Sequence, residues 1–267
     1  MITSLLLKAI KASIVAGEKI MYIYDNEDFE VDFKSDDSPL TKADLASHNE
    51  IVAILENTDI PVLSEEGKNI PYADRKGWEQ LWIVDPIDGT KEFIKKNGEF
   101  TVNIALIENQ KAVLGVIYVP VLKELYFSSV EHGAFKCYDV TAFDKESLED
   151  WIAASDKLPV DKGRTKFTVV ASRSHLSPET EAFIEDLKKE HGEIDTISKG
   201  SSLKLCMVAE GEADCYPRFA PTMEWDTAAG QAICEHAGFE VIDYKTQKPM
   251  LYNREELLNN WFLVKNK

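Results

Sequence analysis

The amino-acid sequence predicts an α/β protein, α+β in its N-terminal half and α/β in its C-terminal half. In the first half, apolar and polar residues alternate over 100–106, and a polar turn at 109–110 leads into another strand-like run, as in an antiparallel hairpin. In the second half, strand-like runs such as 167–171 alternate with helical segments, which is typical of layered sheets and helices. With 267 residues, 44% of them hydrophobic, the chain can bury a large core.

The first half is expected to begin with a helix whose apolar positions are Leu6, Ile10, Ile14 and Val15. We expect this helix to pack against the core, and contact with a membrane surface is the alternative. A second helix is expected to begin near Thr41. The apolar runs that follow it predict strands at about 81–85, 100–108, 111–119, 124–129 and 133–138.

The second half is expected to open with the strand at 167–171 and a helix after it. Ser177 is the expected cap of that helix, Pro178 its first residue and Gly192 its end. Strands and helices then alternate. We therefore expect a single domain that covers residues 1–267. Its two subdomains are expected at about 1–145 and about 150–267, and they meet near the charged stretch around 144–149.

The net charge of −17 argues against a protein that binds the backbone of a nucleic acid, because such binding requires basic patches. A polyphosphorylated small molecule would also be repelled unless metal ions and basic side chains such as Lys204 and Arg218 neutralise the site. The four cysteines lack metal-ligand spacing, so we expect reduced thiols in a cytoplasmic protein. No segment has the length of a membrane span, and peripheral association with the inner membrane stays open.

The segment Asp-Pro-Ile-Asp-Gly-Thr at 85–90 places two carboxylates and a hydroxyl on a tight turn after an apolar run. The strand is expected to end at Asp85, where Pro86 interrupts the ladder. Two carboxylates ~4 Å apart repel by about 4 kcal/mol at an effective dielectric constant of ~20, and a hard cation between them relieves this. Oxygen ligands favour Mg²⁺, Mn²⁺ or Ca²⁺ over zinc. Alone, Asp85 and Asp88 would more often form an Asx-turn.

Two further acidic segments favour the metal site. Glu65 and Glu66 follow another apolar stretch and precede Gly67. Asp226 opens a helical run of small residues, and the amide dipoles of a first helical turn favour an anion. The coincidence of Glu65 and Asp226 with the turn at 85–90 reverses the preference for an Asx-turn, whereas Glu66 is expected outside the ligand set.

Three motifs in this order resemble the inositol monophosphatase superfamily of metal-dependent, lithium-sensitive phosphatases: Ser-Glu-Glu-Gly at 64–67, Asp-Pro-Ile-Asp-Gly-Thr at 85–90 and Trp-Asp-Thr-Ala-Ala-Gly at 225–230. The resemblance covers nearly the whole chain and implies the sugar-phosphatase, or inositol monophosphatase-like, fold. Other segments look like the CysQ-type 3′(2′),5′-bisphosphate nucleotidase branch, at 90–94, 100–106, 172–175, 200–204, 210–211 and 216–219.

The resemblance implies a site with two or three Mg²⁺ ions, with Mn²⁺ as a candidate substitute and Li⁺ and Ca²⁺ as inhibitors. Glu65, Asp85 and the backbone carbonyl of Ile87 would hold one Mg²⁺, and Asp85, Asp88 and Asp226 a second. Most of these ligands fall in the first subdomain, and Asp226 falls in the second.

Catalytic and phosphate-binding roles are implied in the same way. Gly89 and Thr90 would present backbone amides and a hydroxyl to the phosphate, and Asp44 and Thr90 would relay the proton of the nucleophilic water. On spacing alone, Asp44 is instead the third residue of a capping box begun by Thr41, and Thr90 caps a helix that starts at Lys91. The remaining substrate contacts near the metals would be Glu65, Ile87, Asp88 and Asp226.

Four residues match the positions that the nucleotidase branch uses around adenosine and its 5′-phosphate: Ser172, His175, Gly200 and Lys204. Judged by residue type alone, His175 is typical of a surface position and Lys204 of a solvated charge. Arg218 is a further candidate for this end of the substrate.

The expected activity is Mg²⁺-dependent hydrolysis of adenosine 3′,5′-bisphosphate to AMP and phosphate, linked to sulfur metabolism, with 3′-phosphoadenylyl sulfate as an additional candidate substrate. One alternative is an inositol or sugar monophosphatase, although Lys91-Glu92 stands where inositol phosphatases commonly carry threonine-asparagine. The other is a non-catalytic nucleotide or metal sensor on the same fold. The expected partner is a small phosphorylated nucleotide, bound by a monomer or a weak homodimer.

Overall fold

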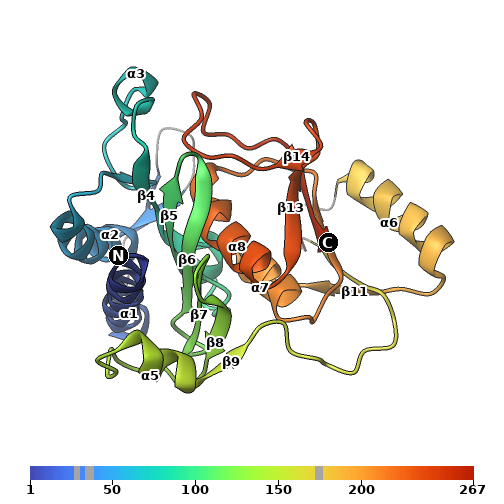
Figure 1. Cartoon of the computed structure of the whole chain (residues 1–267), viewed down its shortest axis with the longest axis horizontal. Coiled ribbons are helices and arrows are strands. Elements are labelled where there is room, and N and C mark those ends of the chain that lie inside the picture. Colours follow the sequence, from blue (N-terminus) through green and yellow to red (C-terminus); the bar gives the residue numbers. More distant parts are fainter. Residues whose placement is uncertain (27–30, 34–38, 172–176) are drawn as a thin grey trace.

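The protein is built of two large β-sheets separated by helices, as the computed structural model shows for residues 1–26, 31–33, 39–171 and 177–267 (Figure 1). Helices α1 and α2 cover the outer face of the first sheet, α7 and α8 lie between the two sheets, and α6 lies beyond the second (Figure 1). These helices span Ile2–Asn26, Lys42–Leu55, Leu203–Ala209, Glu224–His236 and Pro178–His191, respectively. Within the described ranges, no helix combines the length and apolar character of a membrane span.

The first sheet runs in the strand order β3-β4-β5-β6-β7-β8-β9. Strand β3 is parallel to β4, and every other neighbouring pair is antiparallel. The strands span Val62–Ser64, Gln80–Asp88, Thr101–Glu108, Lys111–Val119, Glu124–Ser129, Gly133–Cys137 and Ser155–Lys157. The predicted hairpin is confirmed, and its turn residues Asn109 and Gln110 both have positive φ, as in the turns whose twist suits a hairpin.

Strand β4 differs from the prediction, because it continues past Asp85 to Asp88. Its pairing with β5 is irregular between these two residues: Asp85 lies opposite Asn103, and Asp88 lies opposite Thr101. Pro86 has no N–H to donate, and a local bulge is where a sheet tolerates such a residue. The irregularity thus absorbs the proline and lets the strand resume.

The second sheet has the strand order β11-β10-β12-β15-β13-β14. Strand β10 is parallel to β11 and β12, whereas β15 inserts antiparallel between β12 and β13. The strands β10 to β15 span Thr168–Ala171, Asp195–Ser198, Cys215–Arg218, Phe239–Asp243, Lys248–Pro249 and Phe262–Asn266. Helix α6 has its predicted bounds, with Ser177 accepting a hydrogen bond from the N–H of Thr180 and Gly192 at the C-cap.

The remaining elements are short, and one of them, α4, corresponds to the helix expected from Lys91. A two-stranded antiparallel pair precedes α2, a helical turn follows it, and two short helices flank β4. The charged stretch expected between the halves contains the start of a further helix. These elements are β1 Val31–Phe33, β2 Pro39–Thr41, η1 Glu56–Thr58, α3 Tyr72–Arg75, α4 Thr90–Ile94 and α5 Leu148–Ala153.

Two hydrophobic cores lie on opposite faces of the first sheet. Trp82 and Val84 of β4 pack in the core with α1, while Leu81 and Ile83 pack in the core with α7 and α8. Because side chains alternate along a strand, Asp85 points to the same face as Leu81 and Ile83. The fold therefore aims this carboxylate at the layer between the sheets. Helix α1 packs in the other core, as predicted, through Leu6, Ile10 and Ile14, whereas Val15 is only half-buried.

Candidate active site

Three carboxylates from distant parts of the sequence meet at the carboxyl end of β4. Glu65 follows β3, Asp85 lies in β4, and Asp226 lies in the first turn of α8. One oxygen of each lies within 4.8 Å of one oxygen of each other. The parallel pairing of β3 with β4 explains the first contact, because the N–H of Glu65 donates to the carbonyl of Val84 at 3.1 Å. The three acidic side chains can hold a metal ion.

The electrostatics of this cluster are those of crowded, buried acids. Burial raises the pKa of Asp85 well above its ordinary value. The negative charges of Glu65 and of the nearby aspartates raise it further. Burial and the charge of Asp88 raise the pKa of Asp226 to about 8. All three carboxylates could remain ionised together if a cation offset their repulsion, and an all-oxygen donor set fits a hard divalent cation. The donor set therefore agrees with the expected metal centre.

Asp88 lies beside this cluster and faces the second half of the chain. Its Oδ2 is 3.5 Å from Nδ2 of Asn103. Burial raises the pKa of Asp88 to about 6, against the opposing effects of the Lys204 ammonium and the backbone N–H of Ser202. The turn before it is held by a hydrogen bond from the N–H of Ile87 to Oδ1 of Asp85, at 3.1 Å.

Asp44 and Thr90 meet next to the carboxylate cluster. The Thr90 hydroxyl donates to Oδ1 of Asp44 at 3.2 Å, and the Asp44 side chain is buried. The capping box with Thr41 is also present, so the structural interpretation of Asp44 is confirmed alongside this contact. The interpretation of Thr90 as a cap is wrong: Gly89, with φ of 96°, occupies the N-cap, and Thr90 is the first residue of α4.

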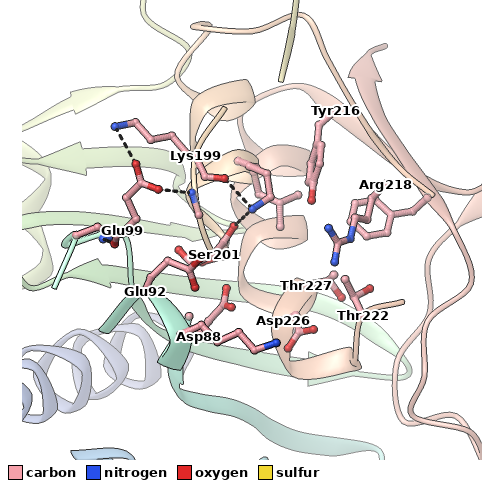
Figure 2. Close-up of a pocket in the computed structure, with 18 of the residues that line it drawn as sticks. Asp88, Glu92, Glu99, Lys199, Ser201, Tyr216, Arg218, Thr222, Asp226 and Thr227 are labelled. Carbon is pink, nitrogen blue, oxygen red and sulfur yellow. Dashed lines mark hydrogen bonds and ion pairs between the residues drawn. The ribbon is translucent and has the colours of Figure 1, made fainter. Parts of the chain in front are cut away.

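A cavity of about 380 Å³ opens from these acids toward the second half of the chain (Figure 2). Its acidic end includes Asp88 and Asp226, and both Gly89 and Gly200 line it. Basic side chains line it although the chain carries a net charge of −17: Lys91, Lys95, Lys199, Lys204 and Arg218. The cavity thus has an acidic end, and its walls carry five basic side chains together with Glu92 and Glu99.

Lys204 and Arg218 supply the two basic groups expected from the sequence. Lys204 is 7% exposed, so its interpretation as a solvated charge is wrong. Its ammonium donates to the carbonyls of Lys199 and Ser201 at 3.1 and 2.7 Å, and burial lowers its pKa to about 8. Arg218 donates to the carbonyl of Pro221, while its buried Nε has no hydrogen-bond partner among the described residues (Figure 2).

Gly200 packs where no larger residue fits. A Cβ at this position would lie 2.9 Å from Cγ of Glu92 and 3.0 Å from the backbone oxygen of Glu99. The Gly200 N–H donates to the Glu99 carboxylate at 2.9 Å, which joins the segment before α7 to the segment before β5. The other two residues predicted around the nucleoside, Ser172 and His175, lie outside the described residues.

Sequence reasoning missed a buried network behind Asp226. The Glu224 carboxylate accepts hydrogen bonds from the backbone of Asn253 and from the backbone and guanidinium of Arg254. Arg75, 2% exposed, donates to the Asn253 side chain and to the carbonyls of Ile70, Arg254 and Glu255. No spacing pattern in the sequence predicts these contacts, because they join residues that are far apart along the chain.

The place of Asn103 at the site was also not predicted, although its residue type in this strand is unusual. Asparagine is disfavoured in strands, yet Asn103 lies in β5 among apolar residues and is 1% exposed. A buried amide in a strand requires hydrogen-bond partners, and this one finds them at the site.

Comparisons with known proteins agree with this geometry. A profile of the inositol monophosphatase family matches residues 2–266. The curated 3′(2′),5′-bisphosphate nucleotidase CysQ of Salmonella typhimurium is 46% identical over 252 residues, which are 93% of this chain and 94% of that protein. The protein of the same name from Escherichia coli K12 is 45% identical over 253 residues, with the same coverage.

Solved structures give the same result for the fold. The crystal structure of CysQ from Bacteroides thetaiotaomicron, described as a bacterial member of the inositol monophosphatase family, superposes with a TM-score of 0.92 at 57% identity, over 99% of this chain and 98% of that one. The suhB protein of Bartonella henselae shares the fold, with a TM-score of 0.75 at 24% identity, over 99% of this chain and 95% of that one. The chain therefore belongs to the inositol monophosphatase family.

Proposed function

We propose that this protein is a Mg²⁺-dependent 3′(2′),5′-bisphosphate nucleotidase that hydrolyses adenosine 3′,5′-bisphosphate to AMP and phosphate, with 3′-phosphoadenylyl sulfate as a second candidate substrate. The observation that carries the proposal is the cavity with Asp88 and Asp226 at one end and the Lys204 and Arg218 side chains in its wall. A nucleotide with two separated phosphates requires positive charge in two places: a metal centre for one phosphate and basic side chains for the other. The names of the relatives at 45–46% identity agree with this assignment.

The metal ligands are proposed from the carboxylates that meet at the end of β4. Glu65, Asp85 and the Ile87 carbonyl would hold one Mg²⁺, and Asp85, Asp88 and Asp226 a second. When bound there, Mg²⁺ supplies Lewis-acid polarisation of the phosphoryl oxygens and offsets the charge of the acids. We propose two or three ions per site, replacement by Mn²⁺, and inhibition by Li⁺ and Ca²⁺.

The Asp44–Thr90 pair is proposed to move the proton of the attacking water. The Thr90 hydroxyl already donates to Asp44, so it can accept a proton from water while it passes its own to the carboxylate. A new phosphorus–oxygen bond forms as the bond to the 3′-oxygen breaks, and the leaving oxygen takes a proton from solvent. Gly89 and Thr90 are proposed to orient the phosphate that reacts.

The rest of the substrate is proposed to lie along the basic wall. Gly200 and Lys204 are the described residues assigned to the nucleoside and its 5′-phosphate, with Arg218 beside them. Ser172 and His175 are assigned to the same end by their sequence match. The four cysteines are buried and unpaired, which supports a reducing compartment such as the cytoplasm.

The test is phosphate release with Mg²⁺ from adenosine 3′,5′-bisphosphate, inositol 1-phosphate and AMP, each with and without Li⁺. We expect rapid, lithium-sensitive release from the bisphosphate alone. A preference for inositol 1-phosphate would retain the metal site and overturn the roles of Gly200 and Lys204. Release from none of the three would favour the sensor, and Asp88→Asn, expected to abolish turnover of an enzyme without unfolding it, serves as the catalytic control.

A further inference from the structure

Three buried polar side chains meet beside Asp88, and the proposed reaction does not use them. Thr101 and Asn103 lie in β5, while Ser202 comes from the second half of the chain, directly before α7. They are 0%, 1% and 3% exposed. The register of the first sheet places Thr101 opposite Asp88 and Asn103 opposite Asp85. The trio thus lies beside Asp85 and Asp88, the two aspartates of β4 that are proposed to bind metal.

The Asn103 amide lies between the two hydroxyls of the trio and the Asp88 carboxylate. Oδ1 of Asn103 is 3.0 Å from the Thr101 hydroxyl and 2.9 Å from the Ser202 hydroxyl, and the two hydroxyls are 2.7 Å apart. Its Nδ2 faces Oδ2 of Asp88 at 3.5 Å. The opposite orientation would turn the amide oxygen toward a carboxylate, and two acceptors repel. The Asp88 carboxylate therefore selects the orientation in which Nδ2 points to it, and the hydroxyls contact the other end of the amide.

Ser202 departs from the usual behaviour of a serine before a helix. A serine at the N-cap normally accepts a hydrogen bond from the backbone of the first turn, and replacing such a cap by alanine costs about 1 kcal/mol. Ser202 occupies the N-cap of α7 but makes no side-chain capping bond, and its hydroxyl contacts Thr101 and Asn103 instead. The backbone of Ser202 is αR, with φ of −68° and ψ of −4°, and not extended as in a capping serine, so its hydroxyl is directed away from the first turn of α7.

We propose that Asn103 is a positioning residue for Asp88, and that the hydroxyls of Thr101 and Ser202 hold its amide in place. The metal affinity of Asp88 then depends on a serine that the second half of the chain supplies. This inference rests on the proposed metal-dependent function. Partners that orient a metal-ligating carboxylate commonly change metal affinity about 10- to 100-fold when removed, even though they do not contact the metal.

The test compares Asn103→Leu, Thr101→Val and Ser202→Ala with the matched control Ser13→Ala. Ser13 is also fully buried and hydrogen-bonded, but it lies in α1 and bonds the carbonyl of Ile10. Mn²⁺ is titrated into the substrate-free protein and its binding followed by electron paramagnetic resonance. We expect the dissociation constant of the weaker Mn²⁺ site to rise about 10-fold or more in Asn103→Leu and less in the two hydroxyl variants. Ser13→Ala should bind Mn²⁺ as the wild type does.

Steady-state kinetics add a second readout. In Asn103→Leu the Mg²⁺ concentration for half-maximal activity should rise with the Mn²⁺ dissociation constant, while the KM for nucleotide at saturating Mg²⁺ changes less than about twofold. A purely structural role would lower the melting temperature of all four variants and leave Mn²⁺ binding unchanged, which would overturn the proposal. Thr101→Val and Ser202→Ala remove one hydroxyl each. If Asn103→Leu fails to fold, the Mn²⁺ dissociation constants of these two variants test the proposal. If the wild type binds Mn²⁺ but hydrolyses no nucleotide, the proposed function fails, while the comparison of Mn²⁺ affinities still tests the role of Asn103.

Discussion

The Thr90 hydroxyl donates a hydrogen bond to Oδ1 of Asp44, although the two residues are 46 positions apart. Oδ2 of the same carboxylate accepts hydrogen bonds from the N–H and the hydroxyl of Thr41, at 2.8 and 2.6 Å. One carboxylate thus caps α2 with one oxygen and contacts the proposed catalytic hydroxyl with the other. The capping role and the proton relay are compatible because they use different atoms.

The first prediction concerns variants that separate the capping role of Asp44 from its role in the proton relay. Thr90→Val and Asp44→Asn should each lower kcat by about 10²- to 10⁴-fold, the usual contribution of a positioned proton-transfer group. Thr41→Ala removes the cap and leaves Thr90 in place, so it should cost about 1 kcal/mol of stability and lower kcat less than tenfold. Phosphate release and urea unfolding of the three variants measure both effects. Equal losses of kcat in all three would contradict the assignment of the relay to Thr90 and Asp44.

Removing one buried charge should stabilise the metal-free protein. Asp85 is 1% exposed and lies against two other carboxylates. In EDTA we expect Asp85→Asn to melt a few degrees above the wild type, because about 1 kcal/mol corresponds to ~2–4 °C for a chain of this size. In Mg²⁺ the order should reverse, since only the wild type gains from binding. Asp139→Asn, at an exposed position, should change neither melting temperature.

The raised pKa values predict how stability depends on pH without metal. The pKa is about 8 for Asp226 and about 6 for Asp88, against about 3.9 for an unfolded aspartate. A carboxyl whose pKa is raised by folding stabilises the protein fully below pH ~4 and loses this contribution as the pH rises through its folded pKa. In EDTA, stability should therefore decline between pH ~4 and ~8, and Mg²⁺ should reduce that decline.

Denaturant unfolding of the wild type and Asp226→Asn across this range measures the effect. The variant should show a shallower decline in EDTA. Other groups titrate as well: the pKa of Glu224 is raised to about 7, with the same sign, and that of His236 is lowered to about 4, with the opposite sign. Both remain in the variant, so the difference between the two proteins reports Asp226 together with its effect on the neighbouring Asp85 and Asp88. Parallel curves would show that Asp226 titrates normally.

The network behind Asp226 predicts a large loss of stability from a variant at Arg75, which does not line the cavity. Arg75→Ala removes four hydrogen bonds to buried or half-buried acceptors, and we expect the free energy of unfolding to fall by about 3 kcal/mol or more. Lys189→Ala breaks an exposed ion pair in α6 and should leave the free energy of unfolding nearly unchanged. A loss below about 1 kcal/mol in Arg75→Ala would show that the guanidinium is readily replaced by water.

The contact at Gly200 predicts a defect in substrate binding. Gly200→Ala places a Cβ against Glu92 and the Glu99 backbone, which should displace the segment before α7 and raise the KM for adenosine 3′,5′-bisphosphate by about tenfold. Gly77→Ala is the matched control, because a Cβ there meets no atom within 4 Å. The control should leave KM unchanged. An unaltered KM in Gly200→Ala would remove this segment from the proposed substrate site.

Much of the fold could be predicted from local patterns. Strands β4 to β8 of the first sheet were predicted because they are buried on both faces and are apolar almost throughout, whereas the short edge strands β3 and β9 were not predicted. Helix α6 was predicted from its Ser177 cap and its Gly192 end. The continuation of β4 to Asp88 was missed, because the bulge at Pro86 depends on pairing with β5 and leaves no local signature.

The candidate site, like the fold, could be predicted only in part. The motifs indicated Glu65, Asp85 and Asp226, and the structure brings them together. The surroundings of Asp88 were not predictable, since Thr101 and Ser202 are 101 positions apart and meet only when the two halves pack. The sequence gives residue types for such contacts but not their distances.

The placement of α8 has a consequence for how the protein is made. This helix carries Asp226, yet it packs on β4, β5, β6 and β7, which the ribosome completes about a hundred residues earlier. Until α8 emerges, the nascent first sheet exposes one apolar face, and Glu65 and Asp85 lack their third partner. Because domains fold from the N-terminus as they are synthesised, the growing chain passes through a stage that is prone to aggregation. A truncated product that ends before α8 would lack Asp226, and with it one of the three carboxylates of the proposed metal centre.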